Sequence, residues 1–447
     1  SMSGLAELLH NKGFEVSGSD SKKGKNTVHL ENMGLDIIYG QRPDNITSDI
    51  DFVVYTAAVK EDNPEYQAVL EADIPLIDRA QLMGQIMLNY SNAIAIAGTH
   101  GKTTTTSMNS LILLEGGLDP TISLGGILDN IGGNIRIGES NIFITEACEY
   151  TNSFLKFNPT IGVVLNVEAE HMDYFKSLDN VRLSFRSFVS RIPKDGLLII
   201  NGDIDDVEYF TEDLECNIIT YSLEKESSPI SNASAHYFAT NIKYDDYGKG
   251  IFDLLKDGKY VDTISLNVVG IHNISNSLPS IALANYFAIP IDVIKKGILA
   301  YTGTDRRFEY KGEICGVTII DDYAHHPTEV KATLKAAKKY PHKSIYCIFQ
   351  PHTYTRTKTF LNEFANVLSL ADVIILTDIY AAREKNPGDI SSKDLMQKLK
   401  ELGKEVYHFE SFDEIENLIL EKCTHGDLLI TMGAGDVVNI GESLLGM

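Results

Sequence analysis

The sequence predicts an α/β protein with more than one parallel sheet, and two observations indicate this fold class. Short apolar segments typical of buried strands alternate with helix-like segments along nearly the whole chain. The alternation falls into three blocks, residues 1–90, 91–307 and 308–447, which fits 447 residues at ~100–200 residues per domain. We therefore expect three α/β domains with these boundaries.

The first block has the pattern of a parallel α/β unit, with the strands FEVSGSD, DIIYG, DFVVYTAAV and IPLID separated by helices. The chain opens directly on a helix-like pattern in which Leu5, Leu8 and Leu9 are apolar. A βαβ nucleotide-binding unit instead begins with a strand and a glycine turn. We therefore expect that the natural N-terminus, with this strand and glycine loop, is missing.

The second and third blocks each predict a further sheet. The central block contains the strands AIAIAG, NIFITEAC, TIGVVLNV, GLLIING and NIITYSL. Residues 233–270 alternate apolar and polar residues, which predicts antiparallel strands added to this sheet. The third block contains VTIIDDYA, SIYCIFQ, DVIILTDI, EVYHFE and DLLITMG, which predict a doubly wound sheet with helices between the strands.

Composition and charge exclude several classes of protein. A formal net charge of −23 argues against a general nucleic-acid or membrane-surface binder, because both need a positive field. The five cysteines are scattered and form no CxxC pair, which disfavours a disulfide framework or zinc site and favours a reducing compartment. No apolar run approaches ~18 residues and no signal peptide begins the chain, so we expect a cytoplasmic protein.

A phosphate-binding loop is predicted directly after strand AIAIA, where GTHGKTT leads into a helical segment. It differs from the standard GxxxxGK[ST] loop, because Ile96 stands where the first glycine is required. Gly98 and Gly101 allow backbone N–H groups to form an anion nest at a helix N-terminus. Lys102 can reach terminal phosphate oxygens and Thr103 can ligate Mg²⁺, whereas the alternative is a plain glycine-containing turn. The predicted nucleotide-binding residues here are Gly98, Thr99, His100, Gly101, Lys102, Thr103 and Thr104.

Polar side chains follow several other strands or begin helices. In the central block these are Glu146, Glu149, Asn166, Glu168, Glu170 and His171, followed by His272, Asn273 and Asn276 at a helix start. Around the third block they are Arg306, Arg307, Asp321, Asp322, Tyr323, His325, His326, His352, Tyr354 and Arg356. Ligands of open α/β sheets bind at the carboxyl ends of the strands, so these positions predict binding sites. The alternatives are solvated acids at strand ends, a helix cap at Asn273 or Ser275, and surface ion pairs for the arginines.

Together these motifs resemble the Mur ligases, the ATP-dependent amide-forming enzymes of peptidoglycan synthesis. The resemblance rests on GTHGKTTTT, EACEY, NVEAEHMDYF, HNISN, RRFE, DDYAHHPTEV, QPHTYTRT and MGAGDV in this order, and on SMSGLAELL and TAAVKEDNPEY before them. It implies a Rossmann-like N-terminal domain that binds a UDP sugar and a central P-loop ATPase-type domain. It also implies a Rossmann-like C-terminal domain that binds an amino acid.

Within the family the motifs are most similar to the member that joins L-alanine to the carboxylate of UDP-N-acetylmuramate. The implied reaction passes through an acyl phosphate and a tetrahedral intermediate and gives ADP and phosphate. The implied small-molecule partners are UDP-N-acetylmuramate, L-alanine, ATP and Mg²⁺, with no nucleic acid and no membrane. The protein is expected to be a monomer or a homodimer.

The resemblance also implies residue roles. Lys102, Glu149, His171 and Arg186 are the predicted catalytic set, with Thr103, Glu149 and His171 as metal ligands. Arg186 stands fifteen residues after His171, where related ligases use a carbamylated lysine. The other implied nucleotide contacts are His272, Asn273, Asn276, Arg307 and Asp322, and the implied amino-acid contacts are Tyr323, His325 and Arg356.

Two other functions are compatible with the fold. A sibling ligase, such as a murein-tripeptide recycling ligase or a folylpolyglutamate synthase, would use different substrates. A non-catalytic nucleotide sensor would keep Lys102 but would not need Glu149 and His171. Production of ADP that requires both other substrates would exclude the sensor.

Overall fold

The computed structural model describes residues 2–56, 58–223, 230–382 and 384–447, and the described part of the chain forms two compact units. The first unit holds the described residues of 2–221, residues 230–236, and Ala282–Ala288. The second holds residues 222–223, Tyr237–Ile281 and Ile289–Met447. These cuts differ from the predicted limits of 1–90, 91–307 and 308–447, which therefore stay a prediction.

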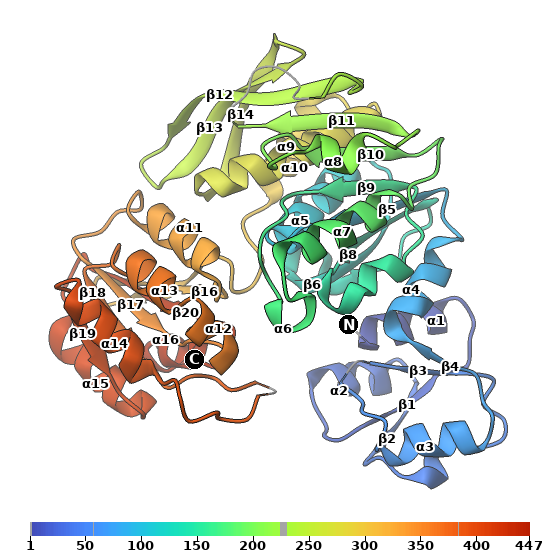
Figure 1. Cartoon of the computed structure of the whole chain (residues 1–447), viewed down its shortest axis with the longest axis horizontal. Coiled ribbons are helices and arrows are strands. Elements are labelled where there is room, and N and C mark those ends of the chain that lie inside the picture. The colour runs from blue at the N-terminus through green and yellow to red at the C-terminus, as the bar shows by residue number, and fades with distance from the viewer. Residues whose placement is uncertain (1, 57, 224–229, 383) are drawn as a thin grey trace. The chain divides into compact units, whose positions relative to one another are not determined.

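The N-terminal part of the first unit alternates short strands and helices, as the sequence predicts (Figure 1). Strands β1 and β2 pair in parallel, and so do β3 and β4. The elements are α1 (Met2–Asn11), β1 (Ser17–Asp20), α2 (Lys25–Asn32), β2 (Asp36–Tyr39), η1 (Pro43–Asn45), β3 (Val53–Tyr55), α3 (Pro64–Glu71), β4 (Leu76–Asp78) and α4 (Arg79–Met87).

The larger sheet of the first unit is built around strand β5, which is buried on both faces between β8 and β9. Its strand order is β11-β10-β9-β5-β8-β6-β7, and only the pairing of β6 with β7 is antiparallel among the pairs given by the described residues. The strands are β5 (Asn92–Ala97), β6 (Thr121–Leu128), β7 (Gly133–Arg136), β8 (Ile142–Ala147), β9 (Ile161–Val164), β10 (Leu197–Asn201) and β11 (Asn217–Ser222). Between them lie α5 (Lys102–Glu115), η2 (Asp129–Ile131), η3 (Tyr150–Lys156), α6 (Met172–Phe175), α7 (Leu178–Val189) and α8 (Glu208–Thr211).

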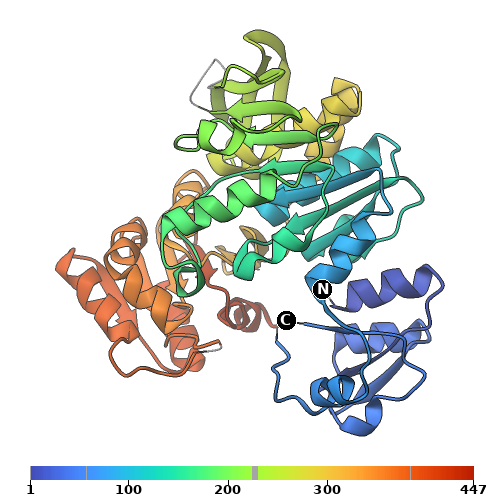
Figure 2. The same cartoon turned by 45° about the vertical axis from the view of Figure 1, so that its right-hand side comes forward.

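Successive side chains of β5 point to opposite faces of the sheet. Ala93, Ala95 and Ala97 pack into one core with Phe185 and Phe188 of α7. Helix α5 contacts β5, β6 and β8, and Figures 1 and 2 show α5 and α7 on opposite sides of this sheet. Helices on both faces explain why β5 is a continuous apolar run, because a central parallel strand is shielded from water on both sides.

The second unit contains an antiparallel meander and a doubly wound sheet, and both confirm the predicted classes. The meander is formed by β12 (Ala235–Tyr244), β13 (Lys249–Lys256) and β14 (Lys259–Val269), and α9 (Ile271–Tyr286) and α10 (Ile291–Ala300) follow it. The first two residues of β12 and the last five of α9 are counted in the first unit. The doubly wound sheet has the strand order β15-β16-β20-β17-β18-β19, with β15 antiparallel at its edge. Its strands are β15 (Glu309–Ile314), β16 (Val317–Asp322), β17 (Ile345–Phe349), β18 (Val373–Leu376), β19 (Glu405–His408) and β20 (Leu428–Met432).

Two apolar cores cover the two faces of this second sheet. Neighbouring residues of β16 point to opposite sides, with Ile320 in one core and Ile319 in the other. The helices on the Ile320 side are α11 (Pro327–Ala337), α13 (Leu361–Leu368) and α14 (Ser392–Glu401). Those on the Ile319 side are α15 (Phe412–Lys422) and α16 (Val438–Leu445), and α12 (Tyr354–Thr359) precedes α13. Among the described residues, no helix has the length and apolar character needed to cross a membrane.

Helix α4 fixes the N-terminal part of the first unit through a close contact at Gly84. A Cβ atom built there would lie 2.0 Å from the carbonyl oxygen of Lys156 in η3. The Asn158 amide adds a hydrogen bond of 3.0 Å to the carbonyl oxygen of Gly84. The absence of a side chain therefore allows the backbones of α4 and η3 to touch.

We expect Gly84→Ala to destabilise the protein, although alanine favours a helix by about 1 kcal/mol over glycine. A backbone oxygen cannot yield cheaply, and overpacking costs ~1–3 kcal/mol, so the steric term exceeds the helical gain. Thermal unfolding of Gly84→Ala and of Gly133→Ala measures the effect, because a Cβ at Gly133 meets nothing within 4 Å. An unfolding temperature for Gly84→Ala equal to that of the control would contradict the packing argument.

Candidate functional site

The loop after β5 has the backbone geometry of an anion site. Gly98 has φ +155°, and a Cβ there would lie 2.8 Å from Cβ of Leu165. Gly101 has φ 82° and is the N-cap of α5. Both positions favour glycine, because a larger residue is excluded by Leu165 in one case and strained by positive φ in the other. The predicted turn into a helix N-terminus is thus present, with Thr104 buried in the first turn of α5.

The segment after β9 holds this loop in place through Asn166. The backbone N–H of His100 donates to Oδ1 of Asn166 at 2.8 Å, and Nδ2 of Asn166 donates to the His100 carbonyl at 3.1 Å. The backbone N–H of Glu168 donates to Oγ1 of Thr99 at 2.9 Å, and a ring nitrogen of His100 lies 3.7 Å from the Glu168 carboxylate. Two loops from adjacent strands therefore form one connected structure.

Lys102 is folded into the loop and paired with a buried acid. Its Nζ donates to Oε2 of Glu149 at 2.9 Å, to the carbonyl of Thr99 at 3.1 Å and to the carbonyl of Gly98. Burial alone would lower the pKa of Lys102, but the nearby Glu149 carboxylate outweighs it, and the pKa lies above its ordinary value. Lys102 is therefore positively charged, and its ammonium group is held against the backbone of the glycine loop.

Two carboxylates of the β8 segment lie beside the start of α5. The Thr103 hydroxyl donates to Oε2 of Glu146 at 2.8 Å, and the backbone N–H of Gly125 donates to Oε1 of the same side chain. Glu149 is 1% exposed, and its Oε1 has no hydrogen-bond partner among the described residues. Nε2 of His171 lies 3.7 Å from that oxygen. A buried carboxylate oxygen without a donor fits a hard cation, so Glu149 could hold Mg²⁺.

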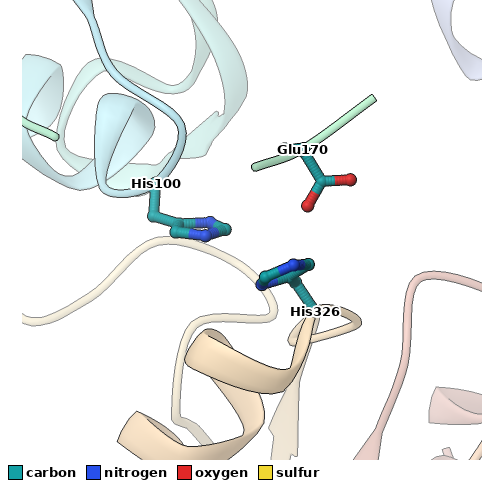
Figure 3. Close-up of side chains that lie close together, drawn as sticks. All are labelled: His100, Glu170 and His326. Carbon is teal, nitrogen blue, oxygen red and sulfur yellow. The ribbon is translucent and has the colours of Figure 1, made fainter. Parts of the chain in front are cut away.

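The rings of His171 and Tyr150 pack against each other beside Glu149. His171 has φ 54° at the start of α6, and its ring centroid lies 4.6 Å from that of Tyr150. Figure 3 shows His100 in the loop before α5 and Glu170 in the segment after β9. A ring nitrogen of His100 and a carboxylate oxygen of Glu170 lie within 4.8 Å of each other. The sheet edge beside the loop therefore gathers His100, Glu149, Glu170 and His171, as their positions after strands predict.

Arg186 contacts residues of α8 and of the segment that follows it. Its guanidinium pairs with Glu212 at 3.0 Å and with Asp213, and it lies over the ring of Tyr209. These contacts give no support to the predicted catalytic role, which stays a prediction. Counting fifteen residues from His171 gives a position in the sequence, but it could not show where the Arg186 side chain points.

In the second unit, Arg306 has a structural role between strand ends. Its guanidinium binds Asp321 at 2.8 Å and donates to the carbonyls of Gly433 and Gly435 at 2.7 and 2.9 Å. The carboxylate of Asp322 accepts from the N–H groups of Phe308 and Ala324 and from the Thr333 hydroxyl. Burial raises the pKa of Asp322 to about 6, although the Arg307 guanidinium opposes this. The predicted ribose contact of Asp322 stays a prediction.

Three of the predicted nucleotide contacts, His272, Asn273 and Asn276, lie in the first turns of α9. Asn273 donates to the carbonyl of Val269 at 2.8 Å, and Asn276 donates to Oδ1 of Asn273 at 3.2 Å. The ring of His272 is partly exposed, yet desolvation by the surrounding protein and the positive charge of Arg307 lower the pKa of His272 to about 4. His272 is therefore neutral at pH 7. The asparagines hold the helix start, and their nucleotide contacts stay a prediction.

The predicted amino-acid contacts form a continuous row across the ends of β16 and β17. The ring centroids of Tyr323 and His325 lie 5.4 Å apart, and those of His325 and His352 lie 5.6 Å apart. Nη1 of Arg356 lies 3.1 Å from Nδ1 of His352. The ring of Tyr380 stacks on His352 with centroids 5.6 Å apart. The structure therefore brings Tyr323, His325 and Arg356 together.

Among the residues that contact those with predicted roles, Tyr380 and Glu329 were not singled out from the sequence, whereas the others were predicted only as polar positions at strand ends. Asn166, Glu146, His352, Tyr380 and Glu329 contact predicted residues through side-chain atoms. The first three lie at or just after the ends of apolar strands, and this signal identified them as binding positions without a specific role. Figure 3 shows His326, the N-cap of α11, whose Nδ1 accepts from the N–H of Thr328. No sequence signal identified Tyr380.

Comparisons with known proteins agree with this organisation. Three family models match consecutive parts of the chain: the Mur ligase family catalytic domain at residues 1–91, the Mur ligase middle domain at 96–284 and the Mur ligase glutamate ligase domain at 306–435. The UDP-N-acetylmuramate–L-alanine ligase of Lachnoclostridium phytofermentans is 59% identical over 447 residues, covering 100% of this chain and 95% of that protein. The protein of the same name from Lachnospira eligens is 54% identical, with the same coverage of both chains.

A solved structure supports the fold at lower identity. The UDP-N-acetylmuramate-alanine ligase MurC of Thermotoga maritima is 27% identical, with a TM-score of 0.82 over 100% of this chain and 96% of that one. Full-length identity of 59% and family models over all three parts show a common architecture and descent. The chain therefore belongs to the Mur ligase family and has its three-domain α/β architecture.

Proposed function

We propose that this protein joins L-alanine to the carboxylate of UDP-N-acetylmuramate with consumption of ATP, as a step of peptidoglycan precursor synthesis. The observation that carries this proposal is the identity of 54–59% over the whole chain to relatives named for that activity. The phosphate loop with its paired Lys102 and Glu149 supplies a matching site. Phosphate release with L-alanine, compared with other amino acids, tests the assignment.

The reaction explains the need for an ATP site. A carboxylate is a poor electrophile, because its negative charge repels nucleophiles and oxide is a poor leaving group. Phosphorylation removes the negative charge from the carboxyl group itself and provides phosphate as a leaving group. Phosphoryl transfer brings anions together inside a chain of net charge −23, so local cations must offset them.

Lys102 and the loop amides supply part of that positive charge. Lys102 lies at the N-terminus of α5, where the helix dipole and backbone N–H groups also favour a phosphate. We propose that Thr103, Glu149 and His171 hold Mg²⁺, because the hydrogen-bond-deficient Oε1 of Glu149 faces His171. When bound, Mg²⁺ would neutralise phosphate oxygens. A carboxylate suits it better than an imidazole does.

The row from Tyr323 to Arg356 is the proposed amino-acid site. The planar guanidinium of Arg356 suits the carboxylate of an amino acid, which accepts two parallel hydrogen bonds. His352 lies between His325 and Arg356, so the row offers a carboxylate-binding end and an imidazole end. A sibling function remains the second candidate, because a murein peptide ligase from Psychrobacter arcticus shares the fold at a TM-score of 0.70.

Lys102→Ala is expected to reduce kcat below about a tenth of the wild-type value, a loss of more than ~1.4 kcal/mol of transition-state stabilisation. The substitution removes the charge held over the anion nest. Phosphate release and thermal unfolding are measured together, because Glu149 loses its buried partner. Lys194→Ala is the control, since that side chain is 80% exposed and pairs with Glu215. Retention of more than a tenth of kcat would count against the role.

Glu149→Ala is expected to raise the Mg²⁺ concentration needed for half-maximal activity, and to do so more than His171→Ala. The reason is the preference of Mg²⁺ for oxygen ligands. Titration of activity with Mg²⁺ checks this, and Mn²⁺, which accepts nitrogen ligands more readily, should partly restore the weakened site. The exposed Glu139 provides a control as Glu139→Ala. An unchanged Mg²⁺ dependence of Glu149→Ala would remove Glu149 from the metal site.

Arg356→Ala is expected to raise the KM for L-alanine by about tenfold or more, equivalent to ~1.4 kcal/mol, with a small effect on the KM for ATP. The substitution removes the fork of donors at one end of the row. Lys358→Ala is a matched control on the same helix, because Lys358 is exposed and pairs with Asp389. Equal effects of Arg356→Ala on both substrates would refute the placement of the amino acid.

A further inference from the structure

Glu329 contacts more groups than a helix cap requires. It is the third residue of α11, and its Oε2 accepts from the backbone N–H of His326, the N-cap, at 3.3 Å. That contact completes an ordinary capping box. The same oxygen also accepts from the backbone N–H of His325 at 3.0 Å and lies 3.3 Å from Nδ1 of its ring. The other oxygen lies 3.8 Å from the guanidinium of Arg307.

The contacts of the His325 ring assign its tautomer. Nδ1 lies 2.9 Å from the carbonyl oxygen of Tyr323 and 3.3 Å from the Glu329 carboxylate. Both oxygens are acceptors, so Nδ1 must carry a hydrogen. In a neutral imidazole only one nitrogen is protonated, and the lone pair then belongs to Nε2. The basic atom of His325 is therefore Nε2.

We propose that Glu329 is a positioning residue that fixes His325 in this tautomer, so that Nε2 accepts a proton from the ammonium group of the incoming amino acid. This inference rests on the proposed function. An amino acid is a nucleophile only after its ammonium group loses a proton, and the Glu329 carboxylate stabilises the imidazolium that results. The arrangement matches the general pattern in which a base is oriented by a third group.

The step balances in atoms and charge. One proton passes from the ammonium nitrogen to Nε2 of His325, and the nitrogen lone pair forms the C–N bond to the acyl carbon. The bond between that carbon and the phosphate oxygen then breaks. The second proton of the nitrogen leaves with the phosphate, which departs as hydrogen phosphate, and His325 returns its proton to solvent.

The surroundings of His325 fit this role. The aromatic neighbours are Tyr323 and His352, with ring centroids 5.4 and 5.6 Å away. The charged groups that act on it are Glu329 directly, Arg307 through Glu329, and Arg356 through His352. A small amino acid with its carboxylate on Arg356 would have its ammonium group at the His325 end of the row.

The first test reads the tautomer in the free protein by ¹⁵N NMR of the histidine rings. The resonances of His325 among the 12 histidines are assigned from their loss in His325→Gln. We expect a protonated Nδ1 in the wild type. In Glu329→Gln the midpoint of the ring titration should move to lower pH by about one unit, because glutamine keeps the cap but removes the charge. A wild-type ring protonated at Nε2, or an unmoved midpoint, overturns the proposal.

The second test separates positioning from capping by kinetics. Glu329→Gln should lower kcat/KM for L-alanine at least about tenfold and shift its acidic limb to lower pH, with the KM for ATP little changed. Glu363→Gln is the matched control, because Glu363 is exposed at the third position of α13. A Glu329→Gln enzyme that behaves like this control has only lost a capping charge, and the proposal fails. If the wild type releases no phosphate with L-alanine, the proposed function fails, while the NMR result still decides the tautomer.

Discussion

The buried ion pair between Lys102 and Glu149 is the interaction on which the site depends. At ~4 Å and an effective dielectric constant of about 20, two opposite charges attract by about 4 kcal/mol, which roughly offsets the cost of removing both from water. Such a pair adds little net stability compared with apolar side chains of similar size. What the pair does is to hold a positive charge at the glycine loop of a strongly acidic protein.

The ion pair requires the strand order of the sheet. Lys102 follows β5, whereas Glu149 follows β8, and these strands are direct neighbours although the two residues are 47 positions apart in sequence. On the other side, β9 supplies Asn166, which holds the loop by two hydrogen bonds to His100. The loop is thus held from both adjacent strands. Preorganised donors stabilise developing charge without a reorganisation cost at the moment of reaction.

The sequence allowed the strands, the glycine loop and the positions of the polar side chains to be predicted, because each depends on local periodicity. Gly98, Gly101 and Lys102 lie as their spacing predicts. The direction of Arg186 could not be predicted, because its partners Glu212 and Asp213 lie just after helix α8, later in the chain. The contact at Gly84 also escaped prediction, since helix propensity gives no information about a backbone 72 residues away.

The same limit explains why Glu329 was not among the predicted site residues. In the sequence it completes a capping box, and that local explanation is sufficient. Only the turn between β16 and α11 brings the His325 ring back over the helix start, where one carboxylate serves the cap and the imidazole together. A cap needs an acceptor, which glutamine also provides, but an imidazolium needs a negative charge. The helix cap alone would accept glutamine at position 329, so the proposed role at His325 is what accounts for a glutamate there.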